Sequence, residues 1–436
     1  MEKIYKVRGG KKLKGEIELK GAKNVATKVI IASLLAEGKS VLENIPQIGD
    51  VEITLKMCES LGVKYRWLEK NVLEIDPSLE SFKVPLEYSG KNRVPILFFG
   101  PLLHRFQKVE VPMAGGCPIG QRPVDFHING YQLLGAKVIY EKNIYYASCE
   151  KLKGTTIELN YPSVGATENL LLGAVLAEGT TVIRNAAIEP EIEDLVLYLQ
   201  SMGAIIYQDV NRTWIIEGVK KLKGSTFKIM NDRIEAASFA SLAMANKSDI
   251  FIKGVDPRGV LTFLNYARKI GASFELFKNG IRFYNSTHLK GIALETDVHP
   301  GFMTDWQPPF SIVLTQAEGV SIIHETVYEN RFGYVSALNE MGAKIYLFTN
   351  CLGSKPCRFT YRDFPHSAIV VGPTKLQCKR LEVPDLRAGF SYLIASLIAE
   401  GESEILGIEK IERGYENIKE RLQNIGAEIK EEIIEK

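Results

Sequence analysis

The segment Ala114–Asp125 holds the residues of this chain whose types and spacing are best suited to chemistry. It reads Ala-Gly-Gly-Cys-Pro-Ile-Gly-Gln-Arg-Pro-Val-Asp, which places Cys117 between glycines and prolines with Arg122 five residues later. Glycine permits backbone angles barred to other residues and proline stiffens the turn, so the thiol could meet a ligand on an exposed loop. A cysteine is more often a small buried apolar residue. The segment alone therefore leaves catalysis and packing both open.

Length and composition limit the class of protein. The 436 residues are enough for two or three domains of ordinary size. Hydrophobic residues make up 45% and charged residues 24%, and 54 Lys and Arg against 52 Asp and Glu leave a formal charge of +2 without a basic stripe. No apolar run has the length of a signal-peptide core or a membrane span. These features predict a globular cytoplasmic protein that binds neither nucleic acid nor membranes.

The cysteines give little sign of a disulfide framework or a metal site. Six are scattered along the chain, at Cys58, Cys117, Cys149, Cys351, Cys357 and Cys378. This distribution is typical of free thiols in a reducing compartment. Cys351 and Cys357 have five residues between them, which is not the paired spacing of a zinc site, so we predict no metal.

The elements that must position Cys117 form an internal repeat. A glycine preceded by Leu, Met or Ile closes a helical pattern six times, at Gly62, Gly135, Gly203, Gly271, Gly342 and Gly426. Each interval reads as strand, helix, strand, helix and further strand. Six such units predict two domains of three with a cleft between them, where pockets commonly form. The last interval is the longest, which predicts an insertion in the sixth unit at about residues 348–380.

The loop that opens the first helix of each unit is the predicted place of function. We assign these loops to Gly21–Asn24, Met113–Arg122, Tyr161–Thr167, Asn231–Glu235, Met303–Trp306 and Pro384–Arg387. Free backbone N–H groups and the helix dipole favour anions at a helix start. Lys23, Arg122, Arg233 and Arg387 oppose that dipole, which indicates a bound phosphate or carboxylate. A solvated face or a structural salt bridge explains any single arginine equally well.

Motifs along nearly the whole chain resemble the enolpyruvyl transferase family. They are Gly15–Asn24, Gly115–Asp125, Ser163–Thr167, Asp232–Glu235, Thr304–Asp305, Glu329–Phe332, Asp385–Gly389 and Arg413–Glu416. The resemblance is to the branch that uses uridine nucleotide sugars, because the phosphate loop typical of the shikimate branch is missing from the second unit. It implies an α/β fold, a two-lobed inside-out α/β barrel of six βαβαββ repeats. One lobe would span residues 21–229, and the other residues 1–20 with 230–436.

The resemblance also implies a reaction and the residues that perform it. The enolpyruvyl group of phosphoenolpyruvate would pass to the 3-hydroxyl of UDP-N-acetylglucosamine through a tetrahedral ketal, with release of phosphate and without metal or cofactor. This is the first committed step of peptidoglycan precursor synthesis. Cys117 would protonate C3, and would be the thiol alkylated by the epoxide fosfomycin, while Asp305 would take the hydroxyl proton. Lys23 and Arg413 complete the implied catalytic set.

The same resemblance assigns two sets of binding residues. The phosphoenolpyruvate set is Lys23, Arg122, Arg331, Arg387, Arg413 and Asp385. The uridine nucleotide sugar set is Asn24, Arg93, Arg122, Ser163, Val164, Gly165, Arg233, Asp305 and Val327. Arginine suits phosphate and carboxylate because its guanidinium donates two parallel hydrogen bonds.

Some positions depart from the family pattern. Tyr161-Pro162 stands where the family often has a lysine ahead of Ser-Val-Gly, and Trp306 is followed by two prolines in Thr304–Phe310. Together with the insertion, these leave two alternatives open: an enolpyruvyl transferase for another uridine nucleotide such as UMP, and a non-catalytic nucleotide-sugar binding protein. We expect a monomer or a weak homo-oligomer.

Overall fold

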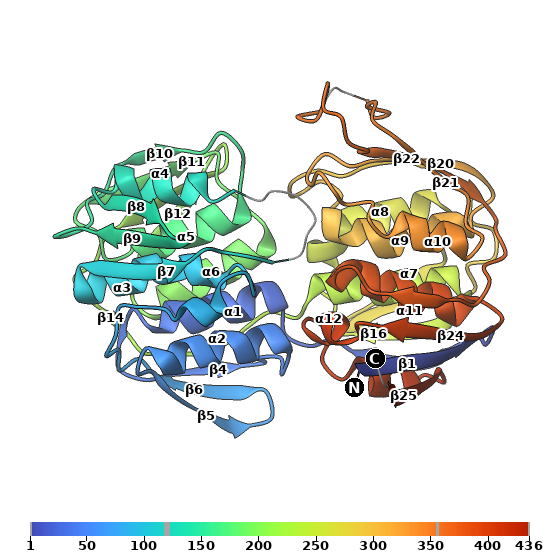
Figure 1. The fold of residues 1–436 in the computed structure, drawn as a ribbon, viewed down its shortest axis with the longest axis horizontal. Helices are drawn as coiled ribbons and strands as arrows, with labels where there is room; N and C mark the ends of the chain where they lie inside the picture. The colour runs from blue at the N-terminus through green and yellow to red at the C-terminus, as the bar shows by residue number, and fades with distance from the viewer. Residues whose placement is uncertain (1, 117–122, 355–356, 435–436) are drawn as a thin grey trace. The chain divides into compact units, whose positions relative to one another are not determined.

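The computed structural model describes residues 2–116, 123–354 and 357–434 and divides the chain into two compact units. We call residues 21–116 and 123–230 the central unit. Residues 2–20 and 231–434, without the two undescribed positions, form the terminal unit (Figure 1). The chain passes from one unit to the other after Lys20 and again after Met230, beside the lobe boundaries that the resemblance implies.

Strand pairing fixes the places where the chain passes between the units. β2 (Lys14–Glu18) pairs in parallel with β16 (Asp249–Lys253) in the terminal unit, although the helix that follows it, α1 (Lys23–Ser33), belongs to the central unit. β15 (Thr226–Lys228) pairs with β4 (Ser40–Glu43) in the central unit, although α7 (Arg233–Ala245) follows it in the terminal unit. Each unit therefore contains one strand from a repeat that continues in the other.

The central unit contains three repeats. Its further strands are β3 (Ala36–Glu37), β5 (Lys64–Glu69), β6 (Val72–Asp76), β7 (Lys108–Pro112), β8 (Lys137–Glu141), β9 (Ile144–Ser148), β10 (Thr156–Glu158), β11 (Thr180–Arg184), β12 (Ile205–Asp209), β13 (Thr213–Glu217) and β14 (Leu222–Lys223). They form the sheets β15-β4-β6-β5, β7-β9-β8 and β10-β11-β13-β12, with a short β14-β3 pair. Its further helices are α2 (Gly49–Ser60), η1 (Leu86–Tyr88), η2 (Val94–Phe98), α3 (Phe99–Phe106), α4 (Asp125–Leu133), α5 (Val164–Ala174) and α6 (Pro190–Ser201).

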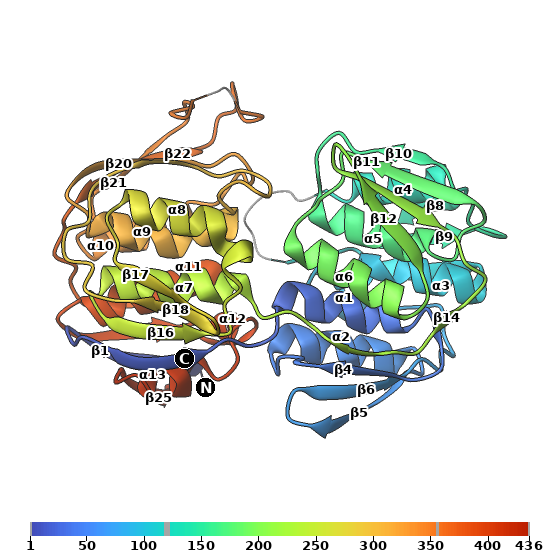
Figure 2. The same cartoon turned by 180° about the vertical axis from the view of Figure 1, so that it is seen from behind.

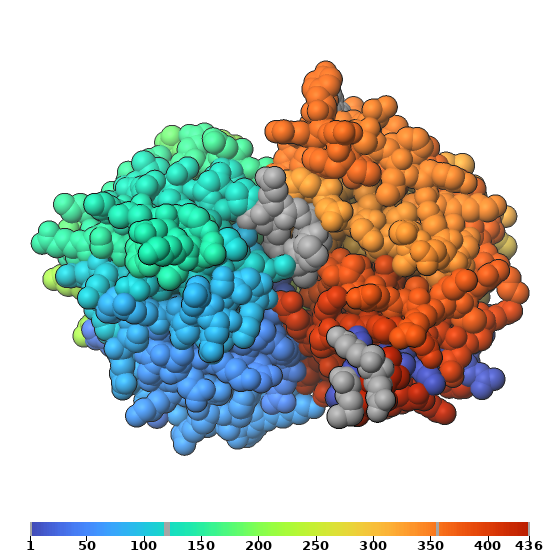
Figure 3. Space-filling model, in the orientation of Figure 1, coloured from blue at the N-terminus to red at the C-terminus, as the bar shows by residue number. Residues whose placement is uncertain are grey.

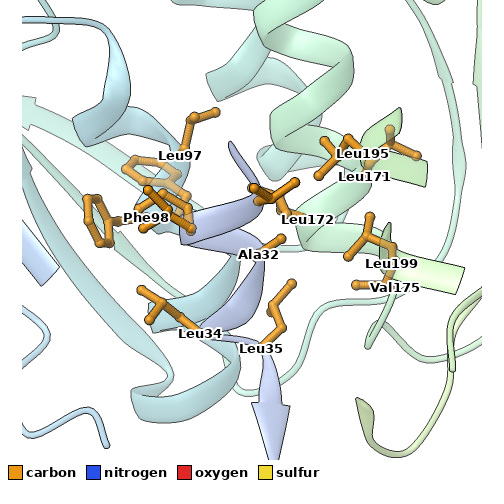
Figure 4. Packing of buried hydrophobic residues seen from close by; sticks show 14 of the residues in the cluster. Ala32, Leu34, Leu35, Leu97, Phe98, Leu171, Leu172, Val175, Leu195 and Leu199 are labelled. Carbon is orange, nitrogen blue, oxygen red and sulfur yellow. The ribbon is translucent and has the colours of Figure 1, made fainter. Parts of the chain in front are cut away.

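The core of the central unit lies between the first helices of its repeats. Figure 4 shows Leu97 and Phe98 of η2, Ala32 of α1 and Leu172 of α5 packed together, and all four side chains are nearly inaccessible to solvent. Burying each large apolar side chain contributes about 1.5–3 kcal/mol. The starts of these helices are consequently held in place by a continuous apolar interior.

The terminal unit repeats this plan. Its further strands are β1 (Glu2–Gly9), β17 (Phe274–Phe277), β18 (Gly280–Phe283), β19 (Ala293–Glu295), β20 (Gly319–His324), β21 (Ile345–Phe348), β22 (Ser367–Gly372), β23 (Arg380–Glu382), β24 (Gly401–Leu406) and β25 (Glu428–Ile434). Its further helices are η3 (Pro257–Val260), α8 (Leu261–Lys269), η4 (Thr304–Trp306), α9 (Gln307–Thr315), α10 (Val335–Glu340), α11 (Leu386–Ile398), α12 (Glu409–Glu412) and α13 (Ile418–Gln423). The sheets are β17-β18-β16-β2, β19-β20-β22-β21 and β23-β24-β1-β25, so the N-terminal strand completes the sixth repeat.

Helices α7, α9 and α11 form the interior of the terminal unit and contact one another (Figure 2). Every residue of α7 and α9 is buried, as are all residues of α11 except its last. Helices buried on every side lie in the interior of their unit, so the sheets lie outside these three. The inside-out α/β architecture predicted from the sequence is confirmed.

The six helix-closing glycines are also confirmed. Gly62, Gly135, Gly203, Gly271, Gly342 and Gly426 have φ between 90° and 106°. A residue in this left-handed region commonly follows a helix, and glycine adopts it without a Cβ penalty. The glycines therefore mark the same turn in all six repeats.

The predicted insertion at residues 348–380 was assigned to the wrong repeat, and its predicted range was too long. Residues 349–366 connect β21 to β22 in the fifth repeat, whereas residues 142–143 make the equivalent connection between β8 and β9. The rest of the predicted range contains β22, which is an ordinary strand of the repeat. The spacing between Gly342 and Gly426 could not show on which side of β22 the extra residues lie. Figure 3 shows the described residues of this connection standing out from the surface of their unit.

The assignment of Met113–Arg122 to a first-helix loop was wrong as well. Residues 113–116 follow β7, which pairs antiparallel with β9 just as β4 pairs with β6, and they precede α4, the second helix of the repeat. The first helix of that repeat begins after Arg93, at η2.

None of the described helices is long and apolar enough to cross a membrane.

Candidate active site

Asp305 lies in η4, directly before α9, in the terminal unit, between two guanidinium groups. Arg331 Nη2 donates to Asp305 Oδ1 at 2.5 Å, and Arg387 Nε lies 3.6 Å from Asp305 Oδ2. Arg331 also donates twice to the Thr304 carbonyl oxygen, at 3.1 and 3.0 Å. The two arginines are only 2% and 4% exposed, so their charges depend on partners inside the protein. These contacts fix the direction of the Asp305 carboxylate.

Arg387 is held by the first turn of its own helix. The side chain of Asp385 caps α11 and accepts hydrogen bonds from the backbone N–H groups of Arg387 at 2.9 Å and Ala388 at 3.2 Å. Arg387 Nη1 donates to the hydroxyl of Tyr415 at 3.1 Å. The predicted residues Asp305, Arg331, Arg387 and Asp385 are therefore brought together.

Burial and nearby charges act in opposite directions on these groups. Burial alone would lower the pKa of Arg331, but the carboxylates of Asp305, Asp385 and Glu325 raise it. Burial raises the pKa of Glu325, although Arg331 and the hydrogen bonds of Glu325 oppose this effect. An arginine among carboxylates stays charged and can meet an anionic ligand.

Three further predicted residues lie in the same unit. Arg233, at the start of α7, is 4% exposed, donates to the Gly259 carbonyl oxygen at 3.2 Å and lies over the ring of Trp306 with 5.4 Å between guanidinium carbon and ring centre. Val327 donates its N–H to Glu325 Oε1 at 2.9 Å. Arg413 directly follows α12 and is half-buried. Trp306 thus supports Arg233 where the sequence departs from the family pattern.

Lys23 begins α1 in the central unit and pairs with a residue that the sequence reasoning missed. Its ammonium nitrogen lies 2.8 Å from Asp50 Oδ2 in the first turn of α2, and the Lys23 side chain keeps 19% of its exposure. Asn24 follows on the same helix turn and is half-buried. The start of α1 therefore offers a partly exposed cation whose position is set by a buried carboxylate.

Ser163, Val164 and Gly165 form the start of α5. Ser163 caps the helix by accepting a hydrogen bond from the Ala166 N–H at 3.3 Å. A Cβ on Gly165 would lie 3.5 Å from the buried imidazole of His127, which packs beneath this turn. Arg93 precedes η2 and donates to the Pro123 carbonyl oxygen at 3.4 Å. All four predicted residues are half-buried, so a ligand could reach them.

Cys117 and Arg122 lie outside the described residues, and their assigned roles stay predictions. The sequence reasoning also missed Glu325 and Tyr415, which hold the Val327 segment and Arg387 in place. The motif Arg413–Glu416 includes Tyr415, but nothing in its spacing predicted that Tyr415 contacts Arg387.

Comparisons with known proteins agree with this arrangement. Residues 7–422 match the family model described as EPSP synthase (3-phosphoshikimate 1-carboxyvinyltransferase). The chain is 49% identical over 435 residues to a UDP-N-acetylglucosamine 1-carboxyvinyltransferase of Protochlamydia amoebophila, covering 98% of this chain and 94% of the relative. A protein of the same name from Chlamydia pneumoniae is 46% identical, with 98% and 94% covered. A third, from Carboxydothermus hydrogenoformans, is 41% identical, with 99% and 98% covered.

Solved structures show the same fold. The enolpyruvyl transferase NikO from Streptomyces tendae matches with a TM-score of 0.87 at 19% identity, covering 99% of each chain. EPSP synthase from Acinetobacter baumannii matches with a TM-score of 0.72 at 19% identity, covering 99% of this chain and 100% of that one. With the family model matched over most of its length and relatives above 40% identity over nearly all of it, the chain belongs to the enolpyruvyl transferase family.

Proposed function

We propose that this protein transfers the enolpyruvyl group of phosphoenolpyruvate to the 3-hydroxyl of UDP-N-acetylglucosamine and releases phosphate. The observation that carries the proposal is the Asp305 carboxylate held between buried Arg331 and Arg387 at a helix start. The names of the relatives at 41–49% identity support the choice of the acceptor.

The reaction balances without an oxidant or a metal. The acceptor oxygen forms a bond to C2 of phosphoenolpyruvate and loses its proton, while C3 gains a proton, which gives a tetrahedral ketal. C3 then loses a proton, the bond from C2 to the phosphate oxygen breaks, and inorganic phosphate leaves. The chemistry requires one base for the hydroxyl, one acid over C3 and cations for phosphate and carboxylate.

The residues of this chain supply each requirement. We assign the base to Asp305, whose direction is fixed by Arg331, and the acid to Cys117. Lys23, Arg122 and Arg413 would bind the phosphate and carboxylate of phosphoenolpyruvate, with Arg331, Arg387 and Asp385 shaping the same charge environment. Arg93, Arg233, Val327 and the α5 start at Ser163–Gly165 with Asn24 would bind the nucleotide sugar, because N–H groups at a helix start favour phosphate.

A phosphate-release assay tests the proposal. Phosphoenolpyruvate is supplied with UDP-N-acetylglucosamine or with UMP, and the product is identified by mass. We expect phosphate and an enolpyruvyl product with the sugar nucleotide, loss of most turnover in Cys117→Ser, and alkylation of Cys117 by fosfomycin in preference to the other five cysteines. Cys378→Ser is the control and should keep full activity. Absence of phosphate release with both acceptors would overturn the assignment.

A further inference from the structure

One end of the sheet β19-β20-β22-β21 gathers residues that the proposed reaction does not use. Glu295 ends β19 and pairs in register with His324, which ends β20. His324 in turn lies opposite Ser367, the first residue of β22, so His366 is its neighbour at the same edge. The connection 349–366 starts and finishes here (Figure 1). Its cysteines, Cys351 and Cys357, lie beside these histidines.

Four possible metal-ligand atoms lie close together at this end of the sheet. One nitrogen each from His324 and His366 and the sulfurs of Cys351 and Cys357 all lie within 4.8 Å of one another. Cys351 Sγ lies 3.6 Å from Cys357 Sγ and 3.4 Å from His366 Nε2. A tetrahedral ion with Zn–S and Zn–N bonds of about 2.3 and 2.05 Å has edges of about 3.8 Å between sulfurs and about 3.6 Å between sulfur and nitrogen. These two distances, 3.6 and 3.4 Å, are each close to the corresponding edge, whereas a disulfide requires about 2.05 Å.

Both histidines present the nitrogen that a metal would need. His324 Nδ1 lies 2.9 Å from Glu295 Oε2, and His366 Nδ1 lies 3.1 Å from the Phe364 carbonyl oxygen. Both oxygens are acceptors, so each Nδ1 carries the proton and each Nε2 keeps its lone pair. His324 Nε2 is buried and has no hydrogen-bond partner among the described residues. A buried unpaired nitrogen is rare and costly, and a carboxylate behind a histidine is a common outer shell of zinc.

The surrounding chain is folded closely around these groups. A Cβ on Gly353 would come within 1.8 Å of Glu295 Oε2 and 1.9 Å of His324 Nδ1, so a larger residue there would displace one of these two side chains. The N–H of Ser354 donates to the same Glu295 oxygen at 3.1 Å, and the N–H of Phe359 donates to Cys357 Sγ at 3.3 Å. Phe359 is 3% exposed and lies against the His366 ring. An apolar cover of this kind excludes solvent from a metal site.

We propose that His324, Cys351, Cys357 and His366 bind one Zn²⁺ ion as a structural site. Four protein ligands leave no open position for water or substrate, which separates a structural zinc from a catalytic one. Two neutral imidazoles and two thiolates balance the charge of the ion, so binding releases the protons of both thiols. The sequence-based prediction of no metal considered the spacing of Cys351 and Cys357 alone, and that spacing omits the two histidines.

The ion would attach the connection 349–366 to the end of β20. The residue after His324 is Glu325, whose Oε1 accepts from the N–H groups of Val327 at 2.9 Å and Tyr328 at 3.0 Å. Arg358, next to Cys357, donates to the Val327 carbonyl oxygen. The zinc would therefore order the Val327 segment from both sides. An effect on the nucleotide sugar rests on the function proposed above, whereas zinc binding does not.

Metal analysis of the whole protein tests the site directly. Protein from zinc-supplemented medium, dialysed against metal-free buffer, should contain one zinc per chain by inductively coupled plasma mass spectrometry. Replacement by Co²⁺ should give the visible bands of a tetrahedral ion and a thiolate charge-transfer band in the near ultraviolet. Cys351→Ser and Cys357→Ser should each lose roughly half of the charge-transfer band, since each removes one of two thiolates. Cys149→Ser and Cys378→Ser are matched controls and should keep it.

A second measurement uses the unmodified chain, so a variant that fails to fold does not decide the outcome. Removal of the metal by a chelator should speed hydrogen exchange in residues 325–328 and 357–366, and leave the short hairpin at residues 142–143 unchanged. Absence of stoichiometric metal, an identical cobalt spectrum in Cys351→Ser, or unchanged exchange after chelation would each overturn the proposal. Metal content and cobalt spectrum are independent of turnover, so their failure is distinguishable from failure of the proposed function.

Discussion

The two units place charged side chains at helix starts in different ways. In the terminal unit Arg233, Arg331 and Arg387 are 2–4% exposed and have partners within that unit. In the central unit Lys23 keeps 19% of its side-chain exposure, and Arg93 is half-buried. Buried charges lose hydration and need protein partners, whereas partly exposed ones keep water until a ligand replaces it.

This difference predicts two kinds of response to substitution. A change in the buried arginine network of the terminal unit should reduce stability and turnover together, because the same contacts serve both. A change at the helix starts of the central unit should act on ligand binding with a smaller effect on stability. The predictions below separate the two cases, beginning with the largest effect.

Asp305→Asn should lower kcat by about 10²–10⁴-fold, because it removes the proposed base. It should also lower the free energy of unfolding by about 3–5 kcal/mol, since Arg331 and Arg387 lose the charge that compensates their burial. Steady-state kinetics and denaturant unfolding measure the two effects.

The matched control for Asp305→Asn is Asp249→Asn, which removes a two-contact arginine pair whose carboxylate is half-buried and whose arginine is more exposed than Arg331 and Arg387. Arg282 donates to both oxygens of Asp249 at 2.8 Å, and Asp249 is the first residue of β16, not part of a helix start. This variant should keep kcat. A wild-type kcat in Asp305→Asn, or an equal loss in the control, would remove Asp305 from the mechanism.

Glu168 tests whether the effect of a substitution on stability depends on the burial of the charged group or on the unit that contains it. It is 2% exposed within α5 of the central unit and lies 3.5 Å from Lys28. Burial raises the pKa of Glu168 to about 7, although Lys28 opposes the shift. The folded state then binds this proton more tightly than the unfolded chain, so the free energy of unfolding falls by up to about 3 kcal/mol as pH rises from about 4.5 to 7.

Glu168→Gln should remove that loss. The difference in unfolding free energy between the variant and the wild type should shift in favour of the variant across this pH window and level off above it. Other groups, such as His127, whose pKa burial lowers to about 3, contribute equally to both proteins and cancel in the difference. A pH-independent difference between pH 4.5 and 7 would show that Glu168 does not hold its proton in the folded state.

Lys23→Ala should act mainly on the donor substrate. We expect the KM for phosphoenolpyruvate to rise by about 10–100-fold, which corresponds to about 1.4–2.7 kcal/mol of binding, with a smaller change for UDP-N-acetylglucosamine. Kinetics with each substrate varied in turn measure this ratio. Lys39→Ala removes an exposed lysine paired with Glu74 and should leave both KM values unchanged. A stability loss in Lys23→Ala as large as in Asp305→Asn would erase the contrast between the units.

The sixfold repeat and its helix-closing glycines could be predicted from the sequence because both depend on local patterns. Each closing glycine follows its own helix, and strand and helix periodicities differ over a few residues. Side chains at helix starts could be named for the same reason, since Asp305, Asp385 and Arg387 follow from position along one repeat. Their partners could not, because Arg331 meets Asp305 and Tyr415 meets Arg387 only through the packing of different helices.

The histidine and cysteine cluster shows the same limit more sharply. The proposed ligands come from the end of β20 and from three positions in the connection 349–366. Their separation in sequence therefore does not match the spacing of a known zinc motif. Strand register brings His324 opposite Ser367, and register is a property of the folded sheet. The displaced loop assignment at Met113–Arg122 has a related cause, because the second repeat replaces a regular first helix with η2 and α3.

The smallest predicted effect concerns Arg358, an exposed residue of the terminal unit that donates to the backbone of the Val327 segment. Its guanidinium donates to the Val327 carbonyl oxygen and lies 4.7 Å from the ring centre of Phe359. Because Val327 is a proposed nucleotide-sugar residue, Arg358→Ala should raise the KM for UDP-N-acetylglucosamine by about 3–10-fold, which corresponds to the loss of one hydrogen bond of about 0.7–1.4 kcal/mol. The KM for phosphoenolpyruvate and the zinc content should stay unchanged, because Arg358 supplies no metal ligand. Arg362→Ala, in the same connection, is the matched control. Equal KM values in both variants would show that the connection does not reach the acceptor, and would restrict its role to the metal site.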